Sequence, residues 1–125
     1  MKKPIATDRA PKPGPYSQGI VAGDTLYVSA VGPVDPATGQ VVGTTIEEQA
    51  ARAIENIRAI VEAAGGTLDD VVKVTAFLSD LGDFPRFNEV YQQRFKPPFP
   101  ARSTFQVVLN RGRIALDAVA YLGKA

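Results

Sequence analysis

The hydrophobic pattern of the first third of the chain is that of short strands. Residues 16–21 and residues 26–31 are runs rich in β-branched and aromatic side chains, and Gly23 with Asp24 separates them as a tight turn. A second turn-prone stretch, residues 35–39, follows. The pattern predicts two strands joined as a hairpin.

The spacing becomes helical from residue 45 onward. Apolar residues recur at every third or fourth position from Ile46 to Ala64, which predicts one long helix with a single buried stripe. A threonine at residue 44 or 45 can cap the first turn together with a glutamate three residues later. The pair Gly65-Gly66 suits a left-handed cap at the end of this helix.

The second half of the chain continues with strand, helix and two final strands. Residues 70–78 form a β-branched run with apolar residues on both faces, and a second helix begins near Asp83 and ends at Lys96-Pro97-Pro98. Two last runs, residues 102–109 and residues 114–122, flank a turn and are expected to pair as a hairpin.

The element order ββαβαββ predicts an α+β sandwich, with a mixed sheet and both helices on one face, in one domain over residues 1–125. Strand positions such as Tyr27, Lys73 and Thr75 mix polar and apolar character. One monomer is therefore expected to leave a partly apolar sheet face exposed, which oligomerisation would cover.

Composition excludes several classes of function. With no His and no Cys, the chain has no imidazole acid/base, no thiolate nucleophile and none of the usual zinc ligand sets. Lys and Arg number 14 against 13 Asp and Glu, a near-neutral balance that argues against a nucleic-acid partner. No apolar run approaches membrane-spanning length, and no apolar segment follows the basic first residues. We therefore expect a soluble cytoplasmic protein without a membrane partner.

Two charged residues in the predicted last strands are candidates for chemistry. Arg102 opens an otherwise apolar strand, and its planar fork of donors suits a carboxylate or phosphate. The alternative for Arg102 is an ion pair with a surface acid at the strand end. Asp117 lies in the apolar run of residues 114–120, where a carboxylate acts either as a proton shuttle or as the buried partner of an arginine.

Several short motifs follow one another along nearly the whole chain. They are Gly14-Pro15-Tyr16-Ser17-Gln18, Val28-Ser29, Pro33-Val34-Asp35-Pro36-Ala37-Thr38-Gly39, Val61-Glu62-Ala63-Ala64-Gly65, Asn88-Glu89-Val90-Tyr91 and Phe99-Pro100-Ala101-Arg102-Ser103. In these motifs and their order the chain resembles the RidA family, also called YjgF. The resemblance implies a homotrimer of chorismate-mutase-like subunits whose sheets form a central barrel, with active sites in the clefts between neighbouring subunits.

The resemblance also implies an activity that needs neither cofactor nor metal. Enamine and imine acids, such as 2-aminoacrylate with its tautomer 2-iminopropanoate, and 2-iminobutanoate, would be hydrolysed to 2-keto acids and ammonia. Arg102 would then grip the substrate carboxylate, and Asp117, which stands where the family usually has Glu, would orient or activate the attacking water. The other residues expected to contact the substrate are Tyr16, Ser29, Ala30, Asn88 and Thr104.

Some of these positions depart from the family pattern or have other uses. Ala30 stands where the family usually has Gly, so it keeps the backbone N–H but adds a methyl group to the cleft. Thr104 stands where some members have Cys, so a hydroxyl replaces a thiol. Tyr16 also suits a core position with one hydrogen bond, and Asn88 also suits packing or capping of the second helix.

Two other functions remain open at this point. Some relatives of the family are described as single-strand endoribonucleases, and others as chaperone-like or ligand-binding regulatory proteins without turnover. The missing histidine and the near-neutral charge weigh against the nuclease. A carboxylate-binding role needs only Arg102 and a cleft, so it stands as the main alternative to imine hydrolysis.

Overall fold

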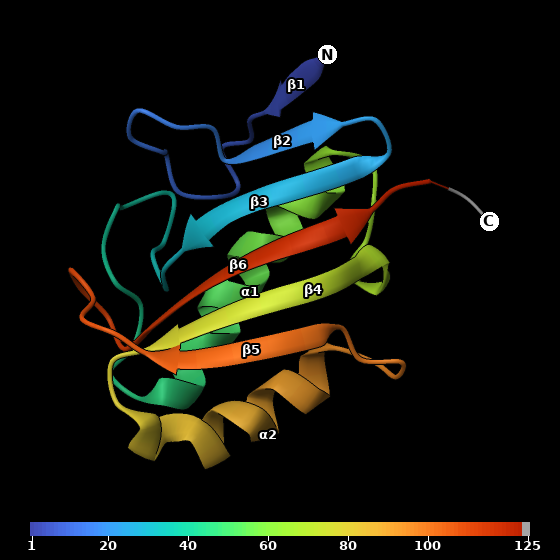
Figure 1. The fold of residues 1–125 in the computed structure, drawn as a ribbon. Helices are drawn as coiled ribbons and strands as arrows, with labels where there is room; N and C mark the ends of the chain where they lie inside the picture. Colours follow the sequence, from blue (N-terminus) through green and yellow to red (C-terminus); the bar gives the residue numbers. More distant parts are fainter. Residues whose placement is uncertain (124–125) are drawn as a thin grey trace.

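The computed structural model describes residues 1–123, in which six strands form one mixed sheet and two α-helices pack against it (Figure 1). The strand order is β1-β2-β3-β6-β4-β5. The elements, in chain order, are β1 (Lys2–Ile5), β2 (Gly19–Ala22), β3 (Thr25–Val31), α1 (Ile46–Ala63), the 3-10 turn η1 (Leu68–Asp70), β4 (Val71–Leu78), the 3-10 turn η2 (Leu81–Asp83), α2 (Phe84–Arg94), β5 (Ala101–Gln106) and β6 (Ile114–Tyr121). The α+β class with two helices is confirmed.

The predicted first hairpin is present, and an additional strand lies beside it. Ala22 pairs with Thr25 across the turn, where Gly23 has a φ of 61°, a conformation that glycine adopts without strain. The edge strand β1 was not predicted, because its residues, Lys-Lys-Pro-Ile, have no alternating pattern. Its proline is tolerated because an edge strand needs only one of its two sides for pairing.

Both ends of α1 follow the predicted capping chemistry. Thr45 accepts a hydrogen bond from the Glu48 backbone N–H, and the Glu48 carboxylate accepts one from the Thr45 backbone N–H, which completes a capping box. At the other end Gly65 has a φ of 92°, and the N–H of Gly66 donates to the Val61 carbonyl at 3.0 Å. Among residues 1–123, no helix has the length and apolarity needed to cross a membrane.

The predicted hairpin between the last two strands is wrong. The strand expected at residues 102–109 ends at Gln106 and pairs in parallel with β4 at the edge of the sheet, because α2 carries the chain back to the starting end of β4. β6 lies instead between β3 and β4, antiparallel to both. Its alternate side chains are buried, as a central strand requires. Nearness in sequence suggested a hairpin, but burial of β6 decided the order.

The two faces of the sheet differ as the pattern predicted. One face packs on α1 and α2 around a core that includes Leu26, Val28, Val74, Ala76, Leu116 and Ala118, each at most 5% exposed. The other face, turned toward the viewer in Figure 1, has no described helix over it. Tyr27, Phe105 and Tyr121 are 53%, 53% and 49% exposed, so this face carries aromatic surface open to solvent.

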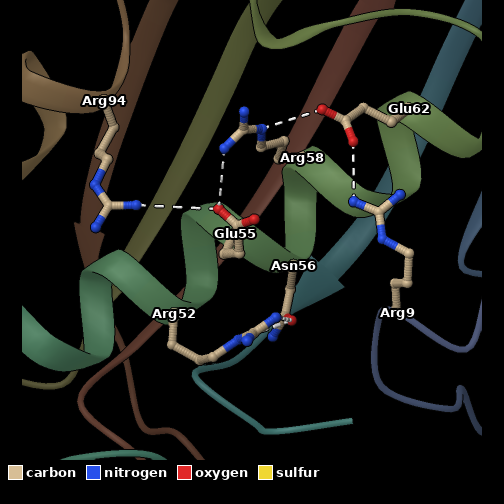
Figure 2. Close-up of polar contacts among 7 residues, drawn as sticks. All are labelled: Arg9, Arg52, Glu55, Asn56, Arg58, Glu62 and Arg94. Carbon is tan, nitrogen blue, oxygen red and sulfur yellow. Dashed lines mark hydrogen bonds and ion pairs between the residues drawn. The ribbon is translucent and has the colours of Figure 1, made fainter.

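A network of ion pairs crosses the outer side of α1 (Figure 2). Glu62 binds Arg9 of the N-terminal loop at 2.9 Å and Arg58 at 3.1 Å. Glu55 binds Arg58 at 3.4 Å and Arg94 of α2 at 4.0 Å. Exposed pairs of this kind each contribute at most about 1 kcal/mol. They link the N-terminal loop and α2 to the outer side of α1.

Candidate functional site

Arg102 lies at the start of β5 and points to the helix side of the sheet. It pairs with Val74, whose side chain is buried under the helices. The guanidinium carbon lies 5.5, 5.1 and 4.7 Å from the ring centres of Phe84, Phe87 and Tyr91 on α2. Aromatic faces attract a cation, so these rings hold the guanidinium in one orientation.

The Arg102 pocket is a cavity of about 370 Å³ lined by Asn88, Tyr91, Gln92, Phe99, Pro100 and Arg102. Nη2 of Arg102 donates to Oδ1 of Asn88 at 2.7 Å, which uses one of the five donors of the guanidinium. No Asp or Glu of residues 1–123 forms an ion pair with Arg102. The alternative of a strand-end ion pair therefore has no partner in the described chain. The arrangement suits a bound carboxylate, which would accept two parallel hydrogen bonds.

Tyr91 belongs to this pocket, although the sequence did not identify it as a site residue. Burial raises the pKa of Tyr91 to about 12, against a smaller lowering effect of Arg102, so the phenol is protonated at neutral pH. Its hydroxyl is buried and has no hydrogen-bond partner within the described residues. The spacing from Asn88 to Tyr91 is the signal that could have identified it, because residues three apart share one helix face.

The Tyr16 pocket, a second cavity of about 240 Å³, lies beside the end of β3, away from the edge strand β5. Its walls are the N-terminal loop, the end of β3 and the connection before β6: Pro11, Lys12, Pro13, Tyr16, Gln18, Ser29, Ala30, Val31, Gly32, Val34, Leu109, Asn110, Arg111, Ile114 and Ala115. Tyr16 is 56% exposed, so it is not a core tyrosine. Ser29 donates its hydroxyl to the Ser17 carbonyl at 2.6 Å, which fastens the segment that carries Tyr16.

A β-bulge aims the backbone at this pocket. Val28 pairs with Ala118 and Val31 with Leu116, so Ser29 and Ala30 together face the single residue Asp117. Bulges of this kind redirect side chains and free backbone groups from regular pairing. No non-glycine residue in the described chain has a positive φ, so the backbone at Ala30 does not require glycine.

Asp117 and Thr104 lie on opposite faces of the sheet. Thr104 pairs with the buried Ala76 and so shares the helix side with Arg102. Asp117 shares a row with Thr75 and Ser103, one residue out of step with Arg102, and therefore faces the open side. Within residues 1–123 Asp117 has no ion-pair partner, so the expected pairing with an arginine is not seen there.

The family described as Endoribonuclease L-PSP matches residues 7–120. The chain belongs to this family, the RidA (YjgF) family. A RutC family protein of Saccharolobus solfataricus is 58% identical over 86% of each chain. The human 2-iminobutanoate/2-iminopropanoate deaminase is 42% identical, covering 98% of this chain and 92% of its own. The crystal structure of RidA from an Antarctic Psychrobacter superposes with a TM-score of 0.90 at 41% identity, covering 95% and 98% of the two chains.

The candidate residues of this RidA-family protein fall into separate groups within one chain. Arg102 and Asn88 line one pocket, and Thr104 shares the helix side of the sheet with Arg102. Tyr16, Ser29 and Ala30 line the other pocket. β3 and β5 are separated by β6 and β4, three strand spacings that amount to about 14 Å. A three- or four-carbon acid held by Arg102 therefore does not reach the Tyr16 pocket of the same chain.

Proposed function

We propose that this RidA-family protein hydrolyses the imines of small 2-amino acids, such as 2-iminopropanoate and 2-iminobutanoate, to 2-keto acids and ammonia. Relatives named 2-iminobutanoate/2-iminopropanoate deaminase are 41% and 42% identical over 98% of the chain, which supports this activity. The observation that carries the proposal is the guanidinium of Arg102, held by aromatic rings and Asn88 and without a carboxylate of its own in the described chain.

The proposed reaction needs few catalytic groups. The imine carbon is electrophilic, and water adds to it to form a C–O bond and a tetrahedral carbinolamine. A proton then moves from the hydroxyl of the carbinolamine to its nitrogen. The C–N bond breaks with its electron pair on nitrogen, ammonia departs, and a 2-keto acid remains. Arg102 binds the carboxylate and fixes the orientation of the imine. Because Asp117 faces the opposite side of the sheet within one chain, the Asp117 carboxylate that accepts a proton from the attacking water belongs to a neighbouring copy.

The proposed site is completed by a second copy of the chain in a homotrimer. Two observations support this: the candidate residues are too far apart within one chain, and one sheet face exposes Tyr27, Phe105 and Tyr121. Packing of such faces against each other buries the aromatic surface. In that assembly Arg102 of one copy meets the Tyr16 pocket of its neighbour. Light scattering tests this directly, and a stable monomer at micromolar concentration contradicts it.

Turnover itself is the decisive experiment. A pyridoxal-phosphate dehydratase acting on serine or threonine generates the imine, and the appearance of keto acid is followed with increasing amounts of this protein. We expect a rate above the spontaneous hydrolysis that rises in proportion to protein. A rate equal to the protein-free control contradicts the proposal. A single-stranded RNA substrate, assayed in parallel, tests the endoribonuclease alternative.

Mixed trimers test whether two copies share each site. Arg102→Ala and Ala30→Trp, the latter filling the Tyr16 pocket, are each expected to be inactive alone. Unfolded and refolded together in equal amounts, they should recover about a quarter of the sites. An intact site needs Arg102 from an Ala30→Trp copy beside an open Tyr16 pocket from an Arg102→Ala copy, and random mixing supplies each half with a probability of about one half. No recovery contradicts a shared site.

Carboxylate binding without turnover is the second candidate function. The position of Asp117 favours it, because this carboxylate faces the side of the sheet away from Arg102. Binding of 2-oxobutanoate with no acceleration of imine hydrolysis is the outcome that would select this function.

A further inference from the structure

Two buried side-chain amides, those of Gln18 and Asn56, hold the loops that form the walls of the Tyr16 pocket. Their side chains belong to residues only 4% and 0% exposed. We infer that Gln18 and Asn56 are positioning residues that set the separation of the two walls, and through it the affinity of the pocket for its substrate. The kinetic part of this inference rests on the proposed function.

Gln18 fixes the N-terminal wall. Its Oε1 accepts a hydrogen bond from the Thr7 N–H at 2.7 Å, and its Nε2 donates to the carbonyls of Thr7 at 2.9 Å, Ala10 at 3.2 Å and Pro11 at 2.9 Å. Pro11 lines the pocket. Only an amide offers an acceptor and two donors on neighbouring atoms, so no other side chain of this size satisfies all these groups.

The same loop has a second, weaker attachment. Arg9 pairs with Glu62 on the outer side of α1 (Figure 2), but the Arg9 side chain is 57% exposed. Solvent screens such a pair, so it adds little to the position of the wall. The buried amide of Gln18 is therefore the main constraint on this loop.

Asn56 fixes the opposite wall from α1. Its Nδ2 donates to the carbonyls of Gly32 at 3.0 Å and Val34 at 2.9 Å, and both residues line the pocket. Its Oδ1 accepts hydrogen bonds from Nε and Nη2 of Arg52 at 3.1 and 2.6 Å. Figure 2 shows the Arg52 side chain lying along the helix toward Asn56. Because α1 is packed in the core, it is a fixed base from which Asn56 holds the backbone after β3.

A third buried amide offers a matched control. Gln49 is 5% exposed and also bonds to backbone, accepting from the Arg113 N–H at 2.7 Å and donating to the Gly43 carbonyl at 3.1 Å. Neither Gly43 nor Arg113 lines the Tyr16 pocket. Loss of this amide therefore has the same chemistry and burial as loss of Gln18, without a direct contact to the pocket walls.

The test replaces each amide by the isosteric acid. In Gln18→Glu and Asn56→Asp, an oxygen replaces the NH₂ group and faces the carbonyls that this group had bound. The other oxygen in Asn56→Asp still accepts the hydrogen bonds from Arg52. We expect KM for 2-iminopropanoate and Kd for 2-oxobutanoate to rise about tenfold or more, with kcat within about threefold of the original. Amide hydrogen exchange should become faster at residues 7–16 in the first variant and at residues 32–34 in the second. Gln49→Glu should leave KM and Kd within about twofold.

If a substitution by Glu or Asp prevents folding, circular dichroism will show it, and milder variants then keep the test decisive. Gln18→Asn retracts the amide, and Arg52→Met removes the support of Asn56; both should raise KM in the same direction by a smaller factor. Folded variants with unchanged KM and Kd overturn the inference, as does an equal effect of Gln49→Glu. If the original protein binds 2-oxobutanoate without turnover, the proposed function fails and Kd alone decides the inference. If it neither binds nor turns over, both fail.

Discussion

The Arg102 pocket is built around one charged side chain, whereas the Tyr16 pocket lies between two loops and the bulged end of β3. In the first, aromatic rings of α2 and Asn88 surround one guanidinium. In the second, a bulge and two loops form the walls, and the buried amides of Gln18 and Asn56 hold these loops by hydrogen bonds to backbone carbonyls. The two pockets therefore supply different features of the proposed site. In the proposed site, the guanidinium comes from the edge strand β5, and α2 supplies the rings and the amide around it. The shape of the other pocket comes from loops that hydrogen bonds hold in place.

Replacing the guanidinium of Arg102 should have the largest effect. Arg102→Lys is expected to lower kcat/KM for imine hydrolysis about 100-fold or more, because an ammonium cannot form two parallel hydrogen bonds to a carboxylate. The aliphatic stem still packs on the rings, so the fold should be unchanged by circular dichroism. Arg58→Lys, in the exposed ion network, is the control and should retain full turnover. Equal rates for the two variants would remove Arg102 as the anchor.

The next largest effect is expected at Asp117, the proposed proton-transfer group. Asp117 lines neither pocket of its own chain. Asp117→Asn should reduce turnover by about tenfold to 100-fold without changing the oligomeric state measured by light scattering. Asp117→Glu should raise it on 2-iminopropanoate, because the carboxylate reaches about 1 Å further, to where the family usually has Glu.

Two outcomes would change the interpretation of Asp117. Full turnover in Asp117→Asn at neutral pH would leave water orientation to substrate or backbone, and Asp69→Asn in η1 serves as the neutral control. A lower rate in Asp117→Glu would instead indicate a cleft adapted to a bulkier substrate, which the added methylene overpacks.

A smaller change should separate shape from charge in the Tyr16 pocket. Ala30→Gly removes one methyl group from the pocket without changing any charge. The preference for 2-iminobutanoate over 2-iminopropanoate, measured as a ratio of kcat/KM, should increase roughly 3- to 10-fold. Ala37→Gly, in the exposed turn at residues 35–39, is the control. An unchanged ratio would show that residue 30 does not touch the substrate side chain.

The smallest effect is expected at the hydroxyl of Tyr91. Tyr91→Phe removes a buried polar atom that has no partner in the described chain, so unfolding in urea should show a gain of about 1 kcal/mol. Turnover should change by less than about twofold. Tyr121→Phe, on the open sheet face, is the control. A loss of stability or activity would mean that the hydroxyl finds a partner in the assembled or ligand-bound protein.

Local signals determined most of the secondary structure. Helical spacing with a capping threonine predicted α1, and glycine at the end of α1 and between β2 and β3 marked real turns. These features are predictable because capping, turn conformation and helical periodicity depend on residues only a few positions apart. The edge strand β1 lacked such a pattern and was missed.

For the candidate site, the sequence by itself determined the chemistry and the tertiary structure decided the geometry. Without histidine or cysteine, and with Arg102 before an apolar strand, the chain was limited to anion binding and carboxylate or hydroxyl chemistry. Only the pairing register of β6 with β4 and of β4 with β5 shows that Arg102 and Asp117 face opposite sides. The reason is physical: strand order and side-chain direction follow from which residues bury together across long sequence separations, and no local pattern encodes that competition.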